Sequence, residues 1–283
     1  MNAFALMLGA AACYTISSLS DKYVAAKAKF TPDGFTFLMC TSMSVFLALT
    51  LPFQTIAFTL SWQAFAGVGL VALCKLLEFR MSVQVLMEMS AFELKAWLGV
   101  TLFVSYLADV FMGEELKALR LVFICFAALG LLLIVRSDKA EKIHYKTIAL
   151  PLFLYLGAKF GYGLTIRSFS GYASSIMLLL PGLAIVALIS LPRVHFKAYS
   201  EKPKGTLNVV LARIPNTAGM LIENAVIAIS LANYSLIQPM ILVTLFIISL
   251  IRREAYSKAN ILGGALAIAG VIGFQLCSWT VYF

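Results

Sequence analysis

The chain has 283 residues, of which 61% are hydrophobic and 12% are charged. An ordinary soluble domain carries about 25% charged residues, so this composition excludes a water-soluble globule. The net charge of +9 arises from 22 Lys and Arg against 13 Asp and Glu, and the basic residues are scattered among long apolar runs. This pattern indicates a membrane protein with basic loops and no nucleic-acid partner.

Ten mostly apolar segments follow one another along the chain, most of them bounded by Pro, Gly or charged residues. Because a helix needs about 20 apolar residues to cross a bilayer, we predict an all-α polytopic membrane protein with ten transmembrane helices. The helices are expected at residues 3–24, 34–53, 61–87, 90–112, 117–136, 147–167, 171–192, 205–231, 234–252 and 257–280.

The two halves of the sequence resemble each other. A shift of 140 residues places Glu114 on Glu254, and the segment 127–130 (AALG) on the segment 267–270 (AIAG). Five helices per repeat is an odd number, so the two repeats must cross the membrane in opposite directions. We therefore predict two inverted five-helix repeats, residues 1–140 and 141–283, as in secondary transporters that bind cargo near the midplane between the halves.

Short motifs near the ends of both repeats support a family resemblance. The segment 112–116 (MGEEL) precedes a helix ending at Gly130, the repeated segment 253–255 (REA) leads to Gly270, and the segment 235–239 (SLIQP) opens another helix. These features resemble the drug/metabolite transporter superfamily, EamA-like branch. The resemblance implies a ten-helix carrier with a central cavity. It leaves the substrate open, since the family moves amino acids, nucleotide sugars, amines and other metabolites.

The basic residues also bear on orientation. Thirteen Lys and Arg lie in odd-numbered connections and three in even-numbered ones. By the positive-inside rule, the odd connections lie in the cytoplasm and both termini outside. The family resemblance implies the opposite, with both termini inside, and the basic loops of the second half favour an outside C-terminus. The expected location is a bacterial inner membrane, with the lipid bilayer as a partner.

Charged residues within the spans are the candidate site residues, because each costs at least about 2.5 kcal/mol at the bilayer centre unless it finds a partner or water. In the helix 205–231, Arg213, Asn216 and Glu223 fall on one face. This polar face either lines a cavity or pairs with charges on neighbouring helices.

Two other spans of the first half carry candidates. Lys75 and Glu78 are three residues apart, close enough to pair with each other. Glu93 falls on Asn233 in the repeat, as a pseudo-symmetric site requires. These four residues are therefore candidate substrate-binding or translocation residues.

Lys159, with Tyr155 and Tyr162 one turn away on either side, forms a basic, hydroxyl-rich face. Neither Lys159 nor Arg213 has an acidic residue three or four places away. Each therefore needs a carboxylate from another helix or a ligand in a hydrated cavity. We expect Lys159 and Arg213 to hold the anionic part of the cargo, and Tyr162 is a further candidate substrate-binding residue.

The sequence contains no recognisable set of catalytic residues. The two histidines lie in basic loops, which excludes a histidine-based triad or metal site within the spans, and no ATP-binding motif is present. We expect no catalytic residues, no metal and no cofactor. Transport would then run on a gradient or on exchange, with the proton as a candidate coupling ion through Glu223 or Glu78. Glu223 is preferred because Arg213, ten residues away, is about 15 Å distant along the helix.

The sequence therefore predicts a secondary-active transporter or exchanger of a small polar metabolite, working by alternating access. An amino acid or related carboxylate is the first expectation for this small-molecule substrate, because basic groups without an obvious partner outnumber acidic ones. Two alternatives stay open. One is a carrier of lipid-linked or amphiphilic cargo, and the other is a non-transporting membrane subunit or scaffold.

Overall fold

The computed structural model describes residues 3–28, 30–88, 91–137, 145–251 and 258–279. Within these residues the chain forms ten long α-helices, one short α-helix and two single-turn 3₁₀ helices. The helices are α1 (Ala3–Ala28), α2 (Pro32–Thr50), α3 (Trp62–Glu88), α4 (Ala91–Phe111), α5 (Ala118–Ser137), α6 (Tyr145–Phe169), α7 (Ser175–Ser190), α8 (Lys197–Glu201), α9 (Pro203–Ile229), α10 (Leu231–Ile251) and α11 (Lys258–Trp279).

Each of the ten segments predicted to be helical coincides with one long helix, and the ends differ by a few residues. Helix α1 runs on to Ala28 rather than ending at residue 24, because the segment 25–28 (AAKA) consists of strong helix formers. Helix α9 ends at Ile229, since Ser230 has an extended backbone with φ −164° and ψ 139°. Helix α8 was not predicted.

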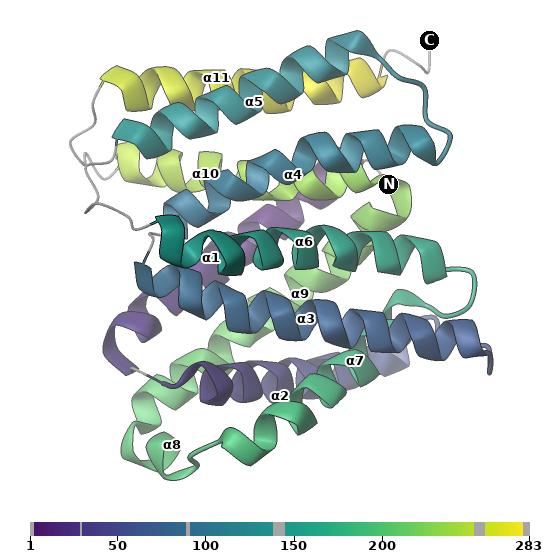
Figure 1. Ribbon diagram of the computed structural model, residues 1–283, viewed down its shortest axis with the longest axis vertical. Helices are drawn as coiled ribbons and strands as arrows, with labels where there is room; N and C mark the ends of the chain where they lie inside the picture. The colour runs from purple at the N-terminus through teal and green to yellow at the C-terminus, as the bar shows by residue number, and fades with distance from the viewer. Residues whose placement is uncertain (1–2, 29, 89–90, 138–144, 252–257, 280–283) are drawn as a thin grey trace.

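The long helices lie side by side in one bundle (Figure 1). Helix α1 begins and α11 ends at the same end of the bundle, which we call the termini end, whereas α8 lies at the opposite end (Figure 1). The connections before α3 and before α7 meet at the termini end, where Thr59 donates to the Tyr172 carbonyl and Ser174 donates to the Ala57 carbonyl. Successive long helices therefore run in alternating directions.

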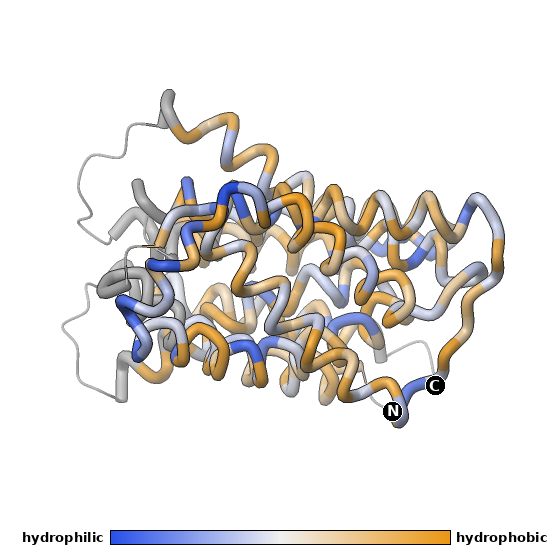
Figure 2. Tube along the Cα trace, turned by 90° about the horizontal axis from the view of Figure 1, so that it is seen from below, coloured by the Kyte–Doolittle hydropathy of each residue, from blue (hydrophilic) through white to orange (hydrophobic). Residues whose placement is uncertain are grey.

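The surface and the interior have the polarity of a protein in a bilayer. Large apolar side chains such as Leu49, Phe153 and Leu188 are about two-thirds exposed along the helices. Figure 2 shows hydrophobic residues along most of the helical length, with many hydrophilic residues near the two ends. Three helical segments, Pro32–Phe53, Ile148–Phe169 and Ser175–Arg193, are long and apolar enough to cross a membrane. The chain is thus an all-helical protein with membrane-length spans.

Helices from opposite halves of the chain pack in pairs: α5 with α11, α1 with α9, α3 with α6, α4 with α10 and α2 with α7. Glycine permits the closest of these contacts. A Cβ atom added to Gly130 would overlap the backbone of Ala267, and one added to Gly270 would overlap the backbone of Ala127. Small residues allow helix backbones to approach in this way, and the approach fixes how α5 and α11 cross.

Candidate functional site

Four buried charged residues meet where α3, α6 and α9 come together. Lys75 and Glu78 come from α3, Lys159 from α6 and Glu223 from α9, and each is less than a tenth exposed. We call these four residues the central cluster. Lys159 lies ten residues before the end of α6 and Lys75 thirteen residues after the start of α3. At 1.5 Å per residue both are about 15–20 Å from the termini end, which is about half of the roughly 30 Å thickness of a bilayer core.

Lysine and glutamate alternate through the central cluster. Lys75 Nζ lies 2.8 Å from Glu78 Oε2, and Lys159 Nζ lies 2.9 Å from Glu78 Oε1. Lys159 Nζ is also 3.4 Å from Glu223 Oε1. The chain of contacts therefore runs Lys75, Glu78, Lys159, Glu223, with two positive and two negative groups. This pairing offsets much of the cost of holding ions away from water.

Tyrosine and asparagine side chains surround these ions. Tyr14 on α1 donates a hydrogen bond to Glu223 Oε2. Lys75 Nζ lies 3.7 Å from the centre of the Tyr162 ring, which is a cation–π distance. The Tyr162 hydroxyl in turn donates to Asn224 Oδ1 at 2.6 Å. The amide nitrogen Nδ2 of Asn224 is buried and has no hydrogen-bond partner among the residues that the structure describes.

Close helix contacts bring these groups together. A Cβ atom added to Gly161 on α6 would lie 3.2 Å from the Cys74 sulfur on α3. A Cβ atom added to Gly219 on α9 would lie 3.2 Å from the Cys13 Cβ on α1. Each contact is a few residues from a charged member of the central cluster. The glycines therefore let α6 approach α3, and α9 approach α1, closely enough for the side chains to meet.

All four members of the central cluster, Lys75, Glu78, Lys159 and Glu223, are predicted site residues, and a fifth predicted residue, Tyr162, contacts the cluster through Lys75. The predicted pairing of Lys75 with Glu78 is confirmed. Lys159 was predicted to need either a carboxylate from another helix or a ligand. It pairs with two such carboxylates, Glu78 and Glu223. Glu223 pairs with Lys159 of α6, which agrees with the alternative that the polar face of its helix pairs with charges on neighbouring helices.

Other predicted site residues make separate contacts. Asn216 Nδ2 donates to Ser17 Oγ at 3.1 Å, and Asn233 Oδ1 accepts from Gln275 at 2.9 Å. Arg213 is fully buried and its Nε donates to the Val209 carbonyl at 3.3 Å. The side chain of Glu93 lies outside the described part of the chain, so its proposed equivalence to Asn233 stays a prediction.

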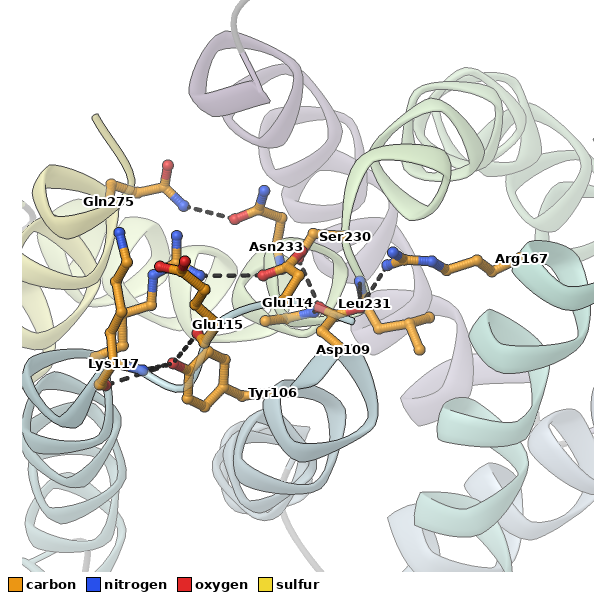
Figure 3. Close-up of polar contacts among 12 residues, drawn as sticks. Tyr106, Asp109, Glu114, Glu115, Lys117, Arg167, Ser230, Leu231, Asn233 and Gln275 are labelled. Atoms are coloured by element: carbon orange, nitrogen blue, oxygen red, sulfur yellow. Dashed lines mark hydrogen bonds and ion pairs between the residues drawn. The ribbon is translucent and has the colours of Figure 1, made fainter. Parts of the chain in front are cut away.

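A second buried cluster lies at the termini end, around Asp109 of α4 (Figure 3). Its carboxylate accepts from Ser230 Oγ at 2.7 Å, from the Leu231 amide at 3.0 Å and from the Ala232 amide at 2.7 Å. Arg167 at the end of α6 completes the set with an ion pair. We call this arrangement the Asp109 cap, because it satisfies the first amides of α10.

Asp109 lies near the end of α4, and its side chain is fully buried. A carboxylate is stabilised at a helix N-terminus by the unpaired amides and by the helix dipole. Ser230 adds to this, since its Oγ accepts from the Asn233 amide at 3.2 Å, as an N-cap residue does. The cap thus links α4, α6 and α10.

Sequence reasoning missed Tyr14, Asn224, Asp109 and Arg167 as site residues. A tyrosine in an apolar helix is usually a packing residue, and Asn224 follows a more conspicuous glutamate. The acidic residue in a span was the available signal for Asp109. Its partners lie 58 to 123 residues further along the chain, at distances over which helical periodicity gives no information.

Comparison with known proteins is informative about the fold alone. No family model matches the chain, and no curated protein matches it. Among solved structures, 25 chains match. One of these, described only as a crystal structure of a protein, has a TM-score of 0.71 at 17% sequence identity, over 99% of this chain and 98% of that chain. The match shows that the whole helical arrangement occurs in a solved structure.

Proposed function

We propose that the chain is a secondary carrier that moves a small polar metabolite across a membrane by alternating access. The observation that carries the proposal is the central cluster, which holds two lysines and two glutamates near mid-depth. Ionised side chains in a bilayer are costly, and they usually mark a substrate or ion pathway. They are contributed by α3 in the first half of the chain and by α6 and α9 in the second.

Contacts between the halves support the inverted repeat that such carriers use. The contact between Gly130 and Ala267 is matched by the contact between Gly270 and Ala127. With a shift of 140 residues, Gly130 corresponds to Gly270 and Ala127 corresponds to Ala267. The same correspondence relates the pairing of α1 with α9 to the pairing of α6 with α3. We infer from this that residues 1–140 and 141–283 are two such repeats.

We infer that two glutamates of the central cluster occupy related places in these repeats. If the Gly219–Cys13 contact corresponds to the Gly161–Cys74 contact, Gly219 on α9 matches Cys74 on α3, which is a local shift of 145 residues rather than 140. This shift places Glu78 on Glu223, so each half offers one carboxylate, and Lys159 Nζ lies between them at 2.9 Å and 3.4 Å. In a carrier that alternates by exchanging the arrangements of its halves, a cation between two such carboxylates is at the pivot.

The Asp109 cap supports a closed termini end. It connects α4 of the first half to α6 and α10 of the second through one buried carboxylate. Alternating access requires that one end be closed while the other opens, and the contacts that close it must break in turn. The cap is suited to this, since all its bonds meet at Asp109 and are lost together when α4 moves.

A non-transporting membrane subunit is the second candidate. The four charges of the central cluster satisfy one another, and a neutral cluster of this kind can hold helices together without any ligand. An experiment must therefore separate transport from stability. A carrier of amphiphilic cargo is a variant of the first proposal, and the same experiment covers it when lipid-linked compounds are included.

The test is uptake of labelled metabolites into sealed vesicles containing the purified protein. We expect saturable uptake of at least one small polar metabolite, and a loss of at least tenfold in Lys159→Met. Lys197→Met is the matched control, because Lys197 is largely exposed on α8. The carrier proposal is wrong if no compound is taken up by well-folded protein, or if Lys159→Met lowers thermal stability while uptake per folded molecule is unchanged. Either result favours a non-transporting membrane subunit.

Related proposals follow from the same reading. We infer that the protein belongs to the EamA-like branch of the drug/metabolite transporters and resides in a bacterial inner membrane. Its helices suit a bilayer, and its ten long helices agree in number with that plan. The proton is proposed as the coupling ion, because Glu223 is a buried carboxylate in a span.

A further inference from the structure

The ion pairs of the central cluster are unequal. Lys75–Glu78 and Lys159–Glu78 are close, at 2.8 Å and 2.9 Å, whereas Lys159–Glu223 is 3.4 Å. The longest contact is also the one that joins α6 to α9. Apart from the hydrogen bond between Tyr162 and Asn224, α6 and α9 share few other contacts, so we expect this pair to separate with less disruption of helix packing than Lys159–Glu78.

An unsatisfied donor belongs to the residue that follows Glu223. Asn224 follows Glu223 on α9, and it is 3% exposed. The Tyr162 hydroxyl occupies its Oδ1 at 2.6 Å, and Tyr162 lies one turn after Lys159 on α6. Asn224 Nδ2 has no partner among the described residues. A buried amide without a hydrogen-bond acceptor is destabilising, so this site favours a ligand that brings one.

We propose that the cargo is a small zwitterion that inserts between Lys159 and Glu223. This inference rests on the proposed carrier function. The anionic group of the cargo would accept from Lys159 Nζ and Asn224 Nδ2. Its cationic group would take the place of Lys159 at Glu223 Oε1, while Tyr14 continues to donate to Oε2.

Charge balance is the physical basis for this choice. The linked groups are two lysines and two glutamates, so their charges cancel. A zwitterion adds no net charge to this balanced set. A monoanion or a monocation would leave one charge in excess within the bilayer, where an uncompensated charge is strongly disfavoured. The cluster is therefore expected to select cargo with both charges over cargo with one.

The experiment compares binding of three matched compounds to the full-length protein in detergent, by calorimetry and by thermal stabilisation. One set is leucine, isocaproate and isoamylamine, and another is phenylalanine, hydrocinnamate and phenethylamine. Smaller and larger amino acids are matched in the same way. In at least one set, the amino acid is expected to bind at least tenfold more tightly than both singly charged analogues.

Two variants give independent readouts. Glu223→Gln leaves one positive charge in excess, so the carboxylate analogue should then bind more tightly than the amino acid. Asn224→Leu should weaken binding of the amino acid and of the carboxylate analogue about tenfold and leave binding of the amine unchanged. Asn208→Leu, on the same helix but near its other end and half-buried, is the control and should change none of the three.

The outcomes separate this inference from the carrier proposal. Selection by charge balance is wrong if a singly charged analogue binds as tightly as its amino acid, or if Glu223→Gln still binds the amino acid more tightly than the carboxylate analogue. The carrier proposal is not affected by either result. If no set binds but vesicles take up another metabolite, the zwitterion inference fails alone. If neither binding nor uptake is found, both proposals fail.

Discussion

Replacing Asp109 with alanine is the sharpest test of the architecture at the termini end. The change removes a buried carboxylate that accepts from Ser230 Oγ, the Leu231 amide and the Ala232 amide and pairs with Arg167. All of these donors then lose their acceptor at once. The start of α10 and the end of α6 should both be destabilised.

The magnitude follows from the burial of the two partners. Removing one member of a buried ion pair costs about 3–5 kcal/mol. The Arg167 side chain is 22% exposed, so water relieves part of the cost, and we expect about 3 kcal/mol for Asp109→Ala. Asp109→Asn keeps an acceptor but loses the charge. A neutral hydrogen bond contributes about 1 kcal/mol against about 1.5–3 kcal/mol for a charged one, so this variant should lose about 1–2 kcal/mol.

The assay is the free energy of unfolding, measured by titrating the purified variants with a denaturing detergent in mixed micelles. Glu201→Ala is the matched control, because its ion pair with Lys197 is 3.9 Å long and lies on an exposed helix. Such pairs contribute well under 1 kcal/mol. Adding Arg167→Met to Asp109→Ala should recover part of the loss, since no unpaired charge then remains.

Two results would contradict the role assigned to the Asp109 carboxylate. A loss for Asp109→Ala no larger than that of Glu201→Ala would mean that the carboxylate does not stabilise the start of α10. In that case the cap could not close the termini end as proposed. Equal losses for Asp109→Ala and Asp109→Asn would mean that the acceptor kept by asparagine contributes nothing, and that the expected smaller loss for Asp109→Asn is wrong.

Three further predictions concern packing, coupling and orientation. Gly270→Ala should destabilise the protein by about 1–3 kcal/mol because a Cβ atom overlaps α5, whereas Gly157→Ala, where a Cβ atom meets nothing within 4 Å, should be neutral or slightly stabilising in the same titration. Collapsing the pH gradient should slow vesicle uptake by the wild type and have little effect on Glu223→Gln; equal uptake by the wild type with and without the gradient would eliminate proton coupling. A reporter fused after Phe283 that fluoresces only in the cytoplasm should stay dark, and a bright signal would place the C-terminus inside.

The sequence predicted the helices and the contacts within a helix, because both depend on local periodicity. Long apolar runs between charged or Pro/Gly breaks located ten helices, and a spacing of three residues predicted the pair Lys75–Glu78. The end of α9 was placed two residues late. Ser230 is small and polar in an apolar stretch, and only its role as the N-cap of α10 shows why the helix stops before it.

Contacts between helices could not be predicted from spacing along the sequence. Tyr14 and Glu223 are 209 residues apart, and nothing in either neighbourhood predicts that they meet. Lys159 was correctly expected to need a partner, but spacing along α6 could not say that the partner is shared by two helices. The sequence therefore predicted which residues needed partners, and only the three-dimensional packing identified those partners.

The single-residue connection at Ser230 has a consequence for how the protein is made. The first amides of α10 have their acceptor on α4, more than 120 residues earlier in the chain. During synthesis, Asp109 and Arg167 emerge from the ribosome well before Leu231, so they can form their ion pair as soon as α6 has inserted. The start of α10 would then dock onto a receptor already assembled. Docking of α10 therefore depends on correct placement of α4, and a chain that misplaces α4 should leave α10 outside the bundle, where proteases can reach it.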